Sequence, residues 1–329
     1  MLLGNLVKSI DKKYRKISVS GISFDSKKVK KGNIFFAING QKTTGNKFIG
    51  EAISKGASVI ISNKIEQPSN LKIPIILVDD TRKILSEACS KFYKKKPTNL
   101  VAVTGTNGKS SVADFFYQIL RLNNIAVASV GTLGIISETY KKKTNLTSVD
   151  SLYLHQTLEI LAKKKVSHVI IEASSHGLKQ KRLDSLNFKI GIFTNLSQDH
   201  LDYHKTMKSY FSAKMHLLKN LLNNKSTIIT DEDNKEFKVI KKNVNKKIVT
   251  IGSNSGTIKI LDNSYNEGNQ KIKISINSKT YNLEIPLIGY FQIKNLLMAI
   301  LAALNFGINK NKIFSQIHKI KPVPGRLEH

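Results

Sequence analysis

The residues with the clearest capacity for chemistry lie in one glycine-rich turn. An apolar run, Leu100–Val103, enters the sequence Gly105-Thr106-Asn107-Gly108-Lys109-Ser110-Ser111, and apolar residues at helical spacing follow it. A strand, a short loop and a helix in this order suit a nucleotide-binding loop, because backbone N–H groups there can hold phosphates. The pattern predicts that Lys109 reaches the outer phosphates and that the Ser110 hydroxyl binds Mg²⁺.

The spacing of this turn departs from the general phosphate-loop pattern G-x-x-x-x-G-K-[ST]. Val103, and not a glycine, stands six residues before Lys109. A short Gly-Lys-Ser run also occurs in ordinary turns, and the turn alone leaves that alternative open. The strand before it and the amphipathic helix after it favour the phosphate loop.

Polar side chains also follow two further predicted strands, where open α/β sheets build their sites. Glu172 ends the apolar run that starts at His168, and a carboxylate there could bind the Mg²⁺ of ATP. A solvent-facing glutamate is the alternative. The segment after the strand Phe188–Thr194 holds two aspartates and two histidines within six residues, a candidate metal or phosphate site, or else a loop of helix-capping residues: Asp199, His200, Asp202 and His204.

The elements that must position these residues alternate between strands and helices, which predicts an α/β protein. Residues 1–97 are expected to form a small α/β domain. Residues 98–325 are expected to form a central, mostly parallel sheet with flanking helices and a small antiparallel insertion at 257–288, and residues 326–329 to begin a linker. The boundary is placed at Lys94–Asn99, which is polar and contains a proline.

The expected elements follow from apolar periodicity. Strands are expected at residues 19–24, 34–38, 57–62, 73–78, 100–103, 125–130, 168–173, 188–194, 227–230, 258–261, 271–276 and 281–285. Helices are expected at residues 48–55, 81–93, 150–162, 206–222, 291–304 and 310–320, in addition to the helix after the glycine-rich turn.

Composition narrows the class of protein. The 329 residues suffice for about two domains, and no apolar run approaches the roughly 20 residues that span a bilayer. The single cysteine, Cys89, excludes an internal disulfide and fits a reducing cytoplasm. The net charge of +30 could serve nucleic-acid or membrane binding, but the lysines are scattered in short runs. A general drift toward lysine, asparagine and isoleucine is the favoured explanation, so neither partner is expected.

Three motifs together resemble one family. TGTNGKSS at 104–111, EASSHGL at 172–178 and FTNLSQDHLDYH at 193–204 are similar to the Mur ligases, and within them to the MurE type. The short phosphate loop is that family's variant. The resemblance covers the whole chain. FDSKKV at 24–29 resembles a uridine-binding segment, with Lys27 where the family has arginine.

The resemblance implies a cytoplasmic bacterial ligase of peptidoglycan synthesis. ATP would phosphorylate the side-chain carboxylate of D-Glu in UDP-MurNAc-L-Ala-D-Glu, and the amine of a diamino acid would then attack the acyl phosphate. A carboxylate is a poor electrophile at neutral pH, so phosphorylation supplies a leaving group, and Lys109 and Mg²⁺ stabilise the anions that must meet. A monomer is expected.

The resemblance also implies roles for particular residues, matched motif by motif. Catalysis would use Lys109, Glu172, His200 and Lys214. Of the two lysines, Lys214 would be carbamylated by CO₂. The implied Mg²⁺ ligands are Ser110, Glu172, His200 and Lys214. The nucleotide would contact Gly105, Thr106, Asn107, Gly108, Lys109, Ser110, Ser111, Asn295 and Arg326. The UDP-substrate would contact Ser26, Thr147, Ser148, Ser174, Gln180 and Arg182. Val149 and Gln292 replace the proline and asparagine that the family usually carries.

The family has a third, C-terminal domain that selects the diamino acid, and the chain is expected to stop at the linker into it. The choice between meso-diaminopimelate and lysine therefore cannot be made from these residues, and the chain alone is expected to be inactive as a ligase. Another Mur or folylpolyglutamate-type ligase is the alternative enzyme. A non-catalytic module that binds a nucleotide or UDP-sugar is the alternative from another class.

Overall fold

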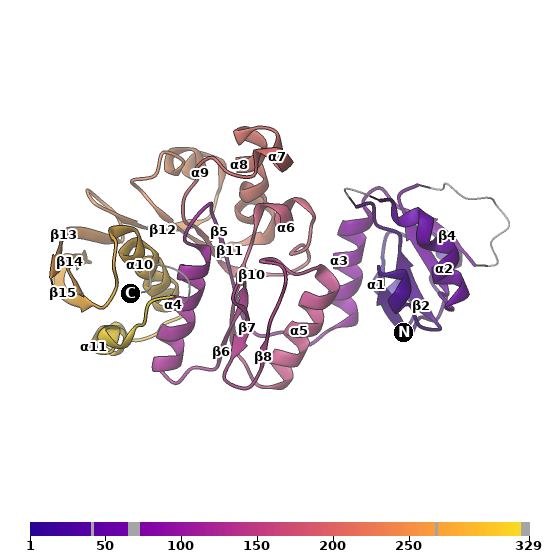
Figure 1. The fold of residues 1–329 in the computed structure, drawn as a ribbon, viewed down its shortest axis with the longest axis horizontal. Helices are drawn as coiled ribbons and strands as arrows, with labels where there is room; N and C mark the ends of the chain where they lie inside the picture. The colour runs from indigo at the N-terminus through magenta and orange to yellow at the C-terminus, as the bar shows by residue number, and fades with distance from the viewer. Residues whose placement is uncertain (41–42, 65–72, 267–268, 324–329) are drawn as a thin grey trace. The chain divides into compact units, whose positions relative to one another are not determined.

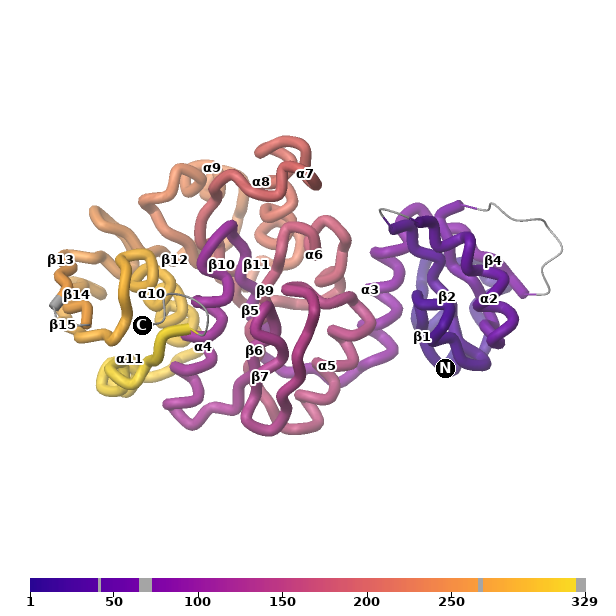
Figure 2. The backbone as a smooth tube through the Cα atoms, viewed as in Figure 1, coloured from indigo at the N-terminus to yellow at the C-terminus, as the bar shows by residue number. Residues whose placement is uncertain are grey.

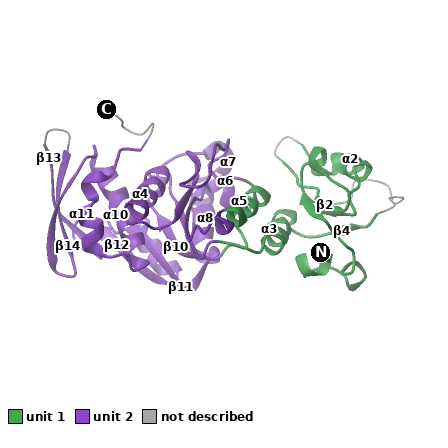
Figure 3. Cartoon of the chain, turned by 90° about the horizontal axis from the view of Figure 1, so that it is seen from below, with its two compact units in different colours: residues 1–96, 150–160, 180–186 green, residues 97–149, 161–179, 187–329 purple. Residues whose placement is uncertain are grey.

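The computed structural model describes residues 1–40, 43–64, 73–266 and 269–323, and these residues fall into two compact units. Unit 1 comprises Met1–Lys96, Asp150–Ile160 and Gln180–Leu186, and unit 2 comprises Pro97–Val149, Leu161–Lys179 and Asn187–His329 (Figure 3). Two later segments thus join the N-terminal residues in unit 1. Each unit has its own hydrophobic core, as expected for domains of this size.

Unit 1 contains a four-stranded parallel sheet in the order β1-β2-β3-β4. The strands are β1 (Gly21–Ser23), β2 (Asn33–Phe36), β3 (Val59–Ser62) and β4 (Ile75–Leu77), and the helices are α1 (Leu3–Leu6), α2 (Ile49–Ser54) and α3 (Thr81–Phe92). Short 3₁₀ turns lie at η1 (Lys12–Tyr14), η2 (Ser26–Lys28) and η3 (Gly45–Phe48). Every residue of β2 and β3 is buried, as expected for strands of a parallel sheet covered on both faces.

Unit 2 is built on an eleven-stranded sheet in the order β15-β14-β13-β12-β11-β10-β5-β9-β6-β7-β8 (Figure 1). The strands from β13 to β6 in this order pair in parallel, and antiparallel strands extend the sheet at both edges. The expected α/β class with a mostly parallel central sheet is therefore confirmed. The expected antiparallel insertion continues this sheet, because β13 pairs with β12.

The strands of unit 2 have the following bounds: β5 (Asn99–Thr104), β6 (Val127–Gly131), β7 (Gly134–Ser137), β8 (Lys141–Lys142), β9 (His168–Glu172), β10 (Phe188–Phe193), β11 (Leu222–Asp231), β12 (Lys247–Gly252), β13 (Ile258–Asn266), β14 (Asn269–Ile276) and β15 (Lys279–Ile285). The later helices are α4 (Lys109–Leu122), α5 (Ser151–Lys163), α6 (Ser175–Lys179), α7 (Leu201–His204), α8 (Met207–His216), α9 (Phe237–Asn243), α10 (Tyr290–Asn305) and α11 (Lys310–Ser315), with a 3₁₀ turn η5 (Ile317–Lys319).

One large hydrophobic cluster of unit 2 lies between a face of this sheet and helices α4, α10 and α11. Helices α4 and α10 are distant in sequence but run beside each other (Figure 2). Nearly every residue of α10 from Gln292 to Ala303 is buried, which explains its strongly apolar sequence. The same hydrophobic cluster therefore anchors both α4 and α10.

Two of the expected helices end earlier in the structure. The helix expected at 206–222 is α-helical only to His216, continues as a π-helical turn η4 (Leu217–Leu221), and Leu222 already pairs with Phe188 of β10. Leu222 packs against Gly191, where a β-carbon would stand 2.7 Å from its side chain. The last helix ends at Ser315 and gives way to η5. Among the described helices, none has the length and apolar character that crossing a bilayer requires.

Candidate nucleotide-binding site

The glycine-rich turn joins β5 to α4 and forces glycine at both of its ends. Gly105 has φ +151° and Gly108 has φ +83°. A β-carbon on Gly105 would stand 1.8 Å from Thr194 Oγ1, and one on Gly108 would stand 2.4 Å from Asn295 Oδ1. Neither contact is sterically possible, so only glycine fits. The backbone of the loop can thereby approach its neighbours, and Gly108 directly precedes the first turn of α4.

Lys109 begins α4 and folds back over the loop. Its Nζ donates hydrogen bonds to the carbonyl oxygens of Gly105, at 2.8 Å, and Thr106, at 2.7 Å. Together with the N-terminus of α4, this ammonium gives the loop a positive charge where a phosphate could bind.

Glu172 ends β9 beside the start of α4 and is almost completely buried. Its carboxylate accepts hydrogen bonds from Ser110 Oγ at 3.0 Å and from the backbone N–H of Thr132 at 2.8 Å, and it lies 3.1 Å from Thr132 Oγ1. Burial raises the pKa of Glu172, and these hydrogen bonds partly oppose the rise. Gly131 leaves room for the carboxylate, because a β-carbon there would stand 2.1 Å from Glu172 Oε1.

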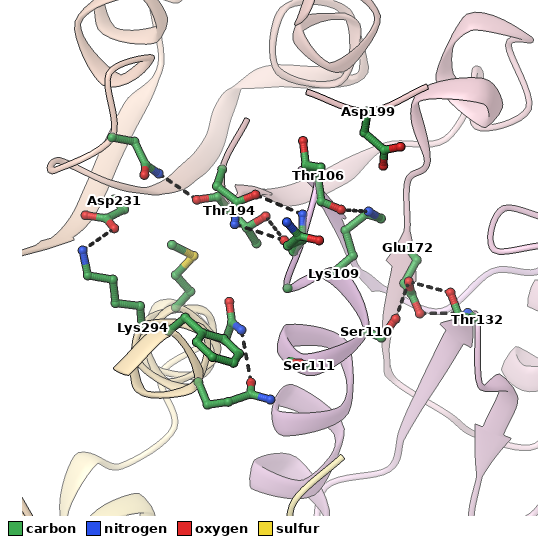
Figure 4. A pocket seen from close by; sticks show the side chains of 18 of the residues that line it. Thr106, Lys109, Ser110, Ser111, Thr132, Glu172, Thr194, Asp199, Asp231 and Lys294 are labelled. Carbon is green, nitrogen blue, oxygen red and sulfur yellow. Dashed lines mark hydrogen bonds and ion pairs between the residues drawn. The ribbon is translucent and has the colours of Figure 1, made fainter. Parts of the chain in front are cut away.

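These groups face a cleft of about 940 Å³ in unit 2 (Figure 4). Its lining comprises Thr106, Asn107, Gly108, Lys109, Ser110, Ser111, Thr132, Thr147, Glu172, Thr194, Asn195, Asp199, Asp231, Asn234, Phe291, Gln292, Lys294, Asn295 and Met298. The volume lies in the range of small-molecule and cofactor sites. The loop, Ser110 and Glu172 line one part of the cleft, and α10 lines another (Figure 4).

The α10 side of the cleft combines an aromatic ring, amides and an ion-pair cluster. Phe291 is 54% exposed, and Asn295 Nδ2 donates to Gln292 Oε1 at 3.2 Å. Lys294 Nζ lies 2.8 Å from one carboxylate oxygen each of Asp231 and Asp233. An exposed ring beside fixed amides is a suitable surface for a flat heterocycle.

Lys214 approaches the phosphate loop from α8. Its side chain is 1% exposed, and Nζ donates a 2.7 Å hydrogen bond to the carbonyl oxygen of Gly105. The amine also lies 4.2 Å from the ring centre of Tyr210. Burial, and then the charge of Lys109, lower the pKa of Lys214 to about 6. The lowered pKa favours the uncharged, nucleophilic form of the amine.

His200 takes a different position from the other expected metal ligands. It has φ +53°, its side chain is 46% exposed, and its ring packs against the ring of His176 at 4.8 Å. Its neighbour Asp199 lines the cleft. The structure thus brings Ser110 to Glu172 and Lys214 to the loop, whereas it directs His200 into an aromatic cluster. Within the described ranges, no three His, Cys, Asp or Glu side chains are arranged to hold a metal ion.

The residues expected to contact the UDP-substrate are divided between the units. In unit 2, Thr147 lines the cleft with its Oγ1 3.1 Å from Thr132 Oγ1. Ser148 Oγ donates to the carbonyl oxygen of Glu172 at 2.7 Å and accepts from the N–H of Ser174 at 2.8 Å. Ser148 and Ser174 thus fix the backbone after β9.

In unit 1, Gln180 Oε1 accepts hydrogen bonds from Arg182 Nε at 3.1 Å and from Arg182 Nη2 at 2.7 Å. Ser26 Oγ donates to Glu51 Oε2 at 2.6 Å, and this bond is the main cause of the lowered pKa of Glu51. Arg326 lies outside the described residues, so its predicted contact with the nucleotide stays a prediction.

Motif reasoning missed several residues that line the cleft. Thr132 follows the end of β6 and Asp231 ends β11, so both lie where strand ends meet at one edge of the sheet. That rule could have found them. The sequence could not have identified Lys294 in this way. It shows a lysine on a predicted helix, but not that this lysine pairs with Asp231 and Asp233, which lie about 60 residues earlier in the chain.

Similarity to known proteins agrees with this geometry. Residues 103–303 match the Mur ligase middle domain, and residues 18–93 match the Mur ligase family, catalytic domain. The chain belongs to the Mur ligase family. The resemblance seen in the motifs is thus confirmed, and the phosphate loop of unit 2 lies within the middle-domain match.

This Mur ligase family member is similar to the UDP-N-acetylmuramoyl-L-alanyl-D-glutamate–2,6-diaminopimelate ligase of Rhizobium meliloti (strain 1021). The two sequences are 35% identical over 315 residues. That match covers 95% of this chain and 65% of the relative, so the chain spans about two thirds of the relative's length.

Solved structures of Mur ligases are also similar to this chain. A UDP-N-acetylmuramoyl-L-alanyl-D-glutamate–2,6-diaminopimelate ligase has a TM-score of 0.88 and 27% identity, and the match covers 100% of this chain and 68% of that one. The MurF ligase of Thermotoga maritima in complex with ADP has a TM-score of 0.64 and 20% identity, covering 94% of this chain and 68% of that one. The second likeness shows the shared fold alone.

Proposed function

We propose that this chain carries the ATP-binding part of a ligase that joins a diamino acid to UDP-MurNAc-L-Ala-D-Glu. The observation that carries the proposal is the arrangement in the cleft. A loop of the size that holds a phosphate lies there together with Lys109, Ser110 and the buried carboxylate of Glu172. The family match supports ligase chemistry. The name of the relative from Rhizobium meliloti supports the UDP-linked dipeptide as acceptor and 2,6-diaminopimelate as the added amino acid.

The reaction follows the expected order. The D-Glu carboxylate attacks the terminal phosphorus of ATP, and ADP leaves with the electron pair of the broken P–O bond. The amine of the diamino acid then attacks the acyl phosphate, loses a proton, and releases inorganic phosphate as the amide forms. Lys109 and the N–H groups at the start of α4 hold the phosphates and offset their charge. Phe291, Gln292 and Asn295 are proposed to receive the base.

The residues present fit a magnesium ion beside the phosphates. The Ser110 hydroxyl and the Glu172 carboxylate lie 3.0 Å apart and offer the oxygen ligands that Mg²⁺ prefers. The ion, when bound, supplies charge neutralisation for the transferred phosphoryl group. Burial raises the pKa of Glu172, and the positive charge of a bound ion would oppose that rise. His200 stays a predicted ligand.

The neutral amine of Lys214 is proposed to form a carbamate with CO₂. The N–C bond forms as the amine lone pair attacks CO₂, and one N–H proton leaves to solvent. The pKa of about 6 supports this step, since only the uncharged amine is nucleophilic. Nuclear magnetic resonance with ¹³C-labelled CO₂ tests the step. A carbamate signal that disappears in Lys214→Arg supports it, and an unchanged signal refutes it.

Calorimetry with AMP-PCP, a non-hydrolysable ATP analogue, in the presence of Mg²⁺ tests the nucleotide site. We expect the chain to bind the analogue and Lys109→Met to bind it at least about tenfold more weakly, since a charge-assisted contact to phosphate is lost. Lys312→Met, at an exposed lysine of α11, is the matched control. Failure of the unaltered chain to bind AMP-PCP would contradict the proposal.

A second titration distinguishes the proposed acceptor from those of related ligases. The chain is titrated with UDP-MurNAc-L-Ala-D-Glu, with UDP-MurNAc-L-Ala and with a folate. Preference for the first ligand supports the proposed substrate. Preference for the folate would favour a folylpolyglutamate-type ligase, and equal binding of the two UDP-sugars would favour a module that recognises only the nucleotide-sugar.

A further inference from the structure

Helix α8 presents two buried polar side chains to the phosphate loop, and only one of them has a proposed chemical role. Tyr210 and Lys214 are four residues apart, which places them on the same face of the helix. Each is 1% exposed. Lys214 contacts the carbonyl oxygen of Gly105, and Tyr210 contacts the next residue of the loop, Thr106.

The hydroxyl of Tyr210 belongs to a hydrogen-bond network that includes Thr106 and Ser197. Its hydroxyl lies 3.2 Å from Thr106 Oγ1. Thr106 Oγ1 in turn donates to the carbonyl oxygen of Ser197 at 3.1 Å and accepts from the N–H of Ser197 at 3.0 Å. Since the Thr106 proton is used toward Ser197, Tyr210 is the donor to Thr106. The network therefore joins α8, the phosphate loop and the segment after β10.

A buried hydroxyl is costly unless it has a partner, so a tyrosine that only filled space could be a phenylalanine. Phenylalanine fills other fully buried positions of unit 2, including Phe115 and Phe193. The hydroxyl of Tyr210 is instead directed at the loop. Thr106 also lines the cleft, as do Gly108 and the first residues of α4 that follow it, so a shift of the Thr106 backbone would also displace that part of the loop.

We propose that Tyr210 is a positioning residue that holds the phosphate loop in its binding conformation through Thr106. The inference rests on the proposed nucleotide site and adds to it a residue that does not touch the nucleotide. Phosphate binding by backbone N–H groups depends on their common orientation, so a tether on the loop acts on the phosphate part of the ligand. The base, proposed to lie against α10, is outside its reach.

The test compares Tyr210→Phe with the unaltered chain. This change removes one hydroxyl and keeps the ring, so the aromatic neighbour of Lys214 stays in place. We expect AMP-PCP to bind about fivefold more weakly, as for one hydrogen bond, while adenosine, measured by competition, binds as before. Tyr265→Phe, at a tyrosine that is 56% exposed on β13, is the control and should change neither affinity.

A double-mutant cycle with Thr106→Val separates the tether from a general effect on packing. If the Tyr210–Thr106 bond carries the effect, the double variant binds AMP-PCP about as weakly as Thr106→Val alone. Circular dichroism verifies that each variant is folded. Equal loss of AMP-PCP and adenosine binding in Tyr210→Phe, unchanged binding of both, or additive losses in the cycle would each overturn the inference. If the unaltered chain does not bind AMP-PCP, the proposed function fails first.

Discussion

Replacing Lys294 by methionine should destabilise unit 2 through one buried carboxylate. Lys294 Nζ lies 2.8 Å from Oδ2 of Asp231 and 2.8 Å from Oδ2 of Asp233, and it joins the end of β11 to α10. The Asp231 side chain is only 4% exposed, whereas that of Asp233 is 29% exposed. Methionine keeps most of the length of the lysine stem and removes the charge, so Asp231 loses its cation while it remains buried.

The expected loss is about 3 kcal/mol in the free energy of unfolding, the lower end of the range for an unpaired buried charge. The lower end applies because Lys294 is itself 19% exposed and because Asp233 can turn to water. Asp231 also keeps one hydrogen bond, which its Oδ1 accepts from the N–H of Asp233 at 2.9 Å. That bond compensates only part of the lost interaction.

The loss should depend on pH in a defined direction. Burial raises the pKa of Asp231, and its bond to Lys294 opposes the rise. Without Lys294 the pKa of Asp231 rises further, so the folded variant takes up a proton at a pH where the unfolded chain does not. The variant therefore gains stability as pH falls through the raised pKa, down to the ordinary value of about 4. The difference from the unaltered chain should be smaller at pH 5 than at pH 8.

Denaturant unfolding followed by circular dichroism at both pH values measures this difference. Lys312→Met, at an exposed lysine of α11, is the control for loss of one positive charge. The double variant Lys294→Met, Asp231→Asn should recover much of the loss, because it removes the buried charge. Equal losses in Lys294→Met and Lys312→Met, or a loss of the same size at both pH values, would refute the reasoning.

Three further predictions concern single positions. Gly108→Ala should weaken AMP-PCP binding by more than about tenfold because of its contact with Asn295, whereas Gly307→Ala, also at positive φ but with nothing within 4 Å, should cost only about 1 kcal/mol of stability and leave binding unchanged. Glu172→Gln should abolish the Mg²⁺-dependent part of AMP-PCP affinity, roughly tenfold or more; equal Mg²⁺ dependence in both proteins would count against the proposed ligand. Burial raises the pKa of the Cys89 thiol, so a thiol reagent should label it at least about a hundredfold faster after unit 1 unfolds; rapid labelling of the folded chain would contradict its complete burial.

Much of the fold follows from local pattern. The strand before the loop and the helix after it appear as β5 and α4, since apolar periodicity reflects which side chains must leave water. The expected helix at 206–222 is wrong at its end, because Leu222 pairs with β10 and its preceding turn is π-helical. Tertiary packing therefore decided where this helix ends, and no local feature of the sequence predicts that residue.

The order of strands was beyond sequence reasoning. β9 lies between β5 and β6, although β6 comes first in the chain after α4. This order places Glu172 beside the start of α4, where Ser110 can reach its carboxylate. The sequence pattern alone placed Glu172 at the end of a strand and Ser110 at the start of a helix. It did not predict the distance between the two side chains.

By itself, the sequence determined the phosphate loop, the alternation of strands and helices, and the family, because these depend on residue type and short spacing. Tertiary structure decided which polar side chains share an environment. Lys109 and Lys214, 105 positions apart in number, meet at the carbonyl oxygen of Gly105. Lys294 meets Asp231 and Asp233, and Tyr210 meets Thr106. Such long-range contacts arise only when the chain closes on one core, because burial and not local propensity brings their elements together.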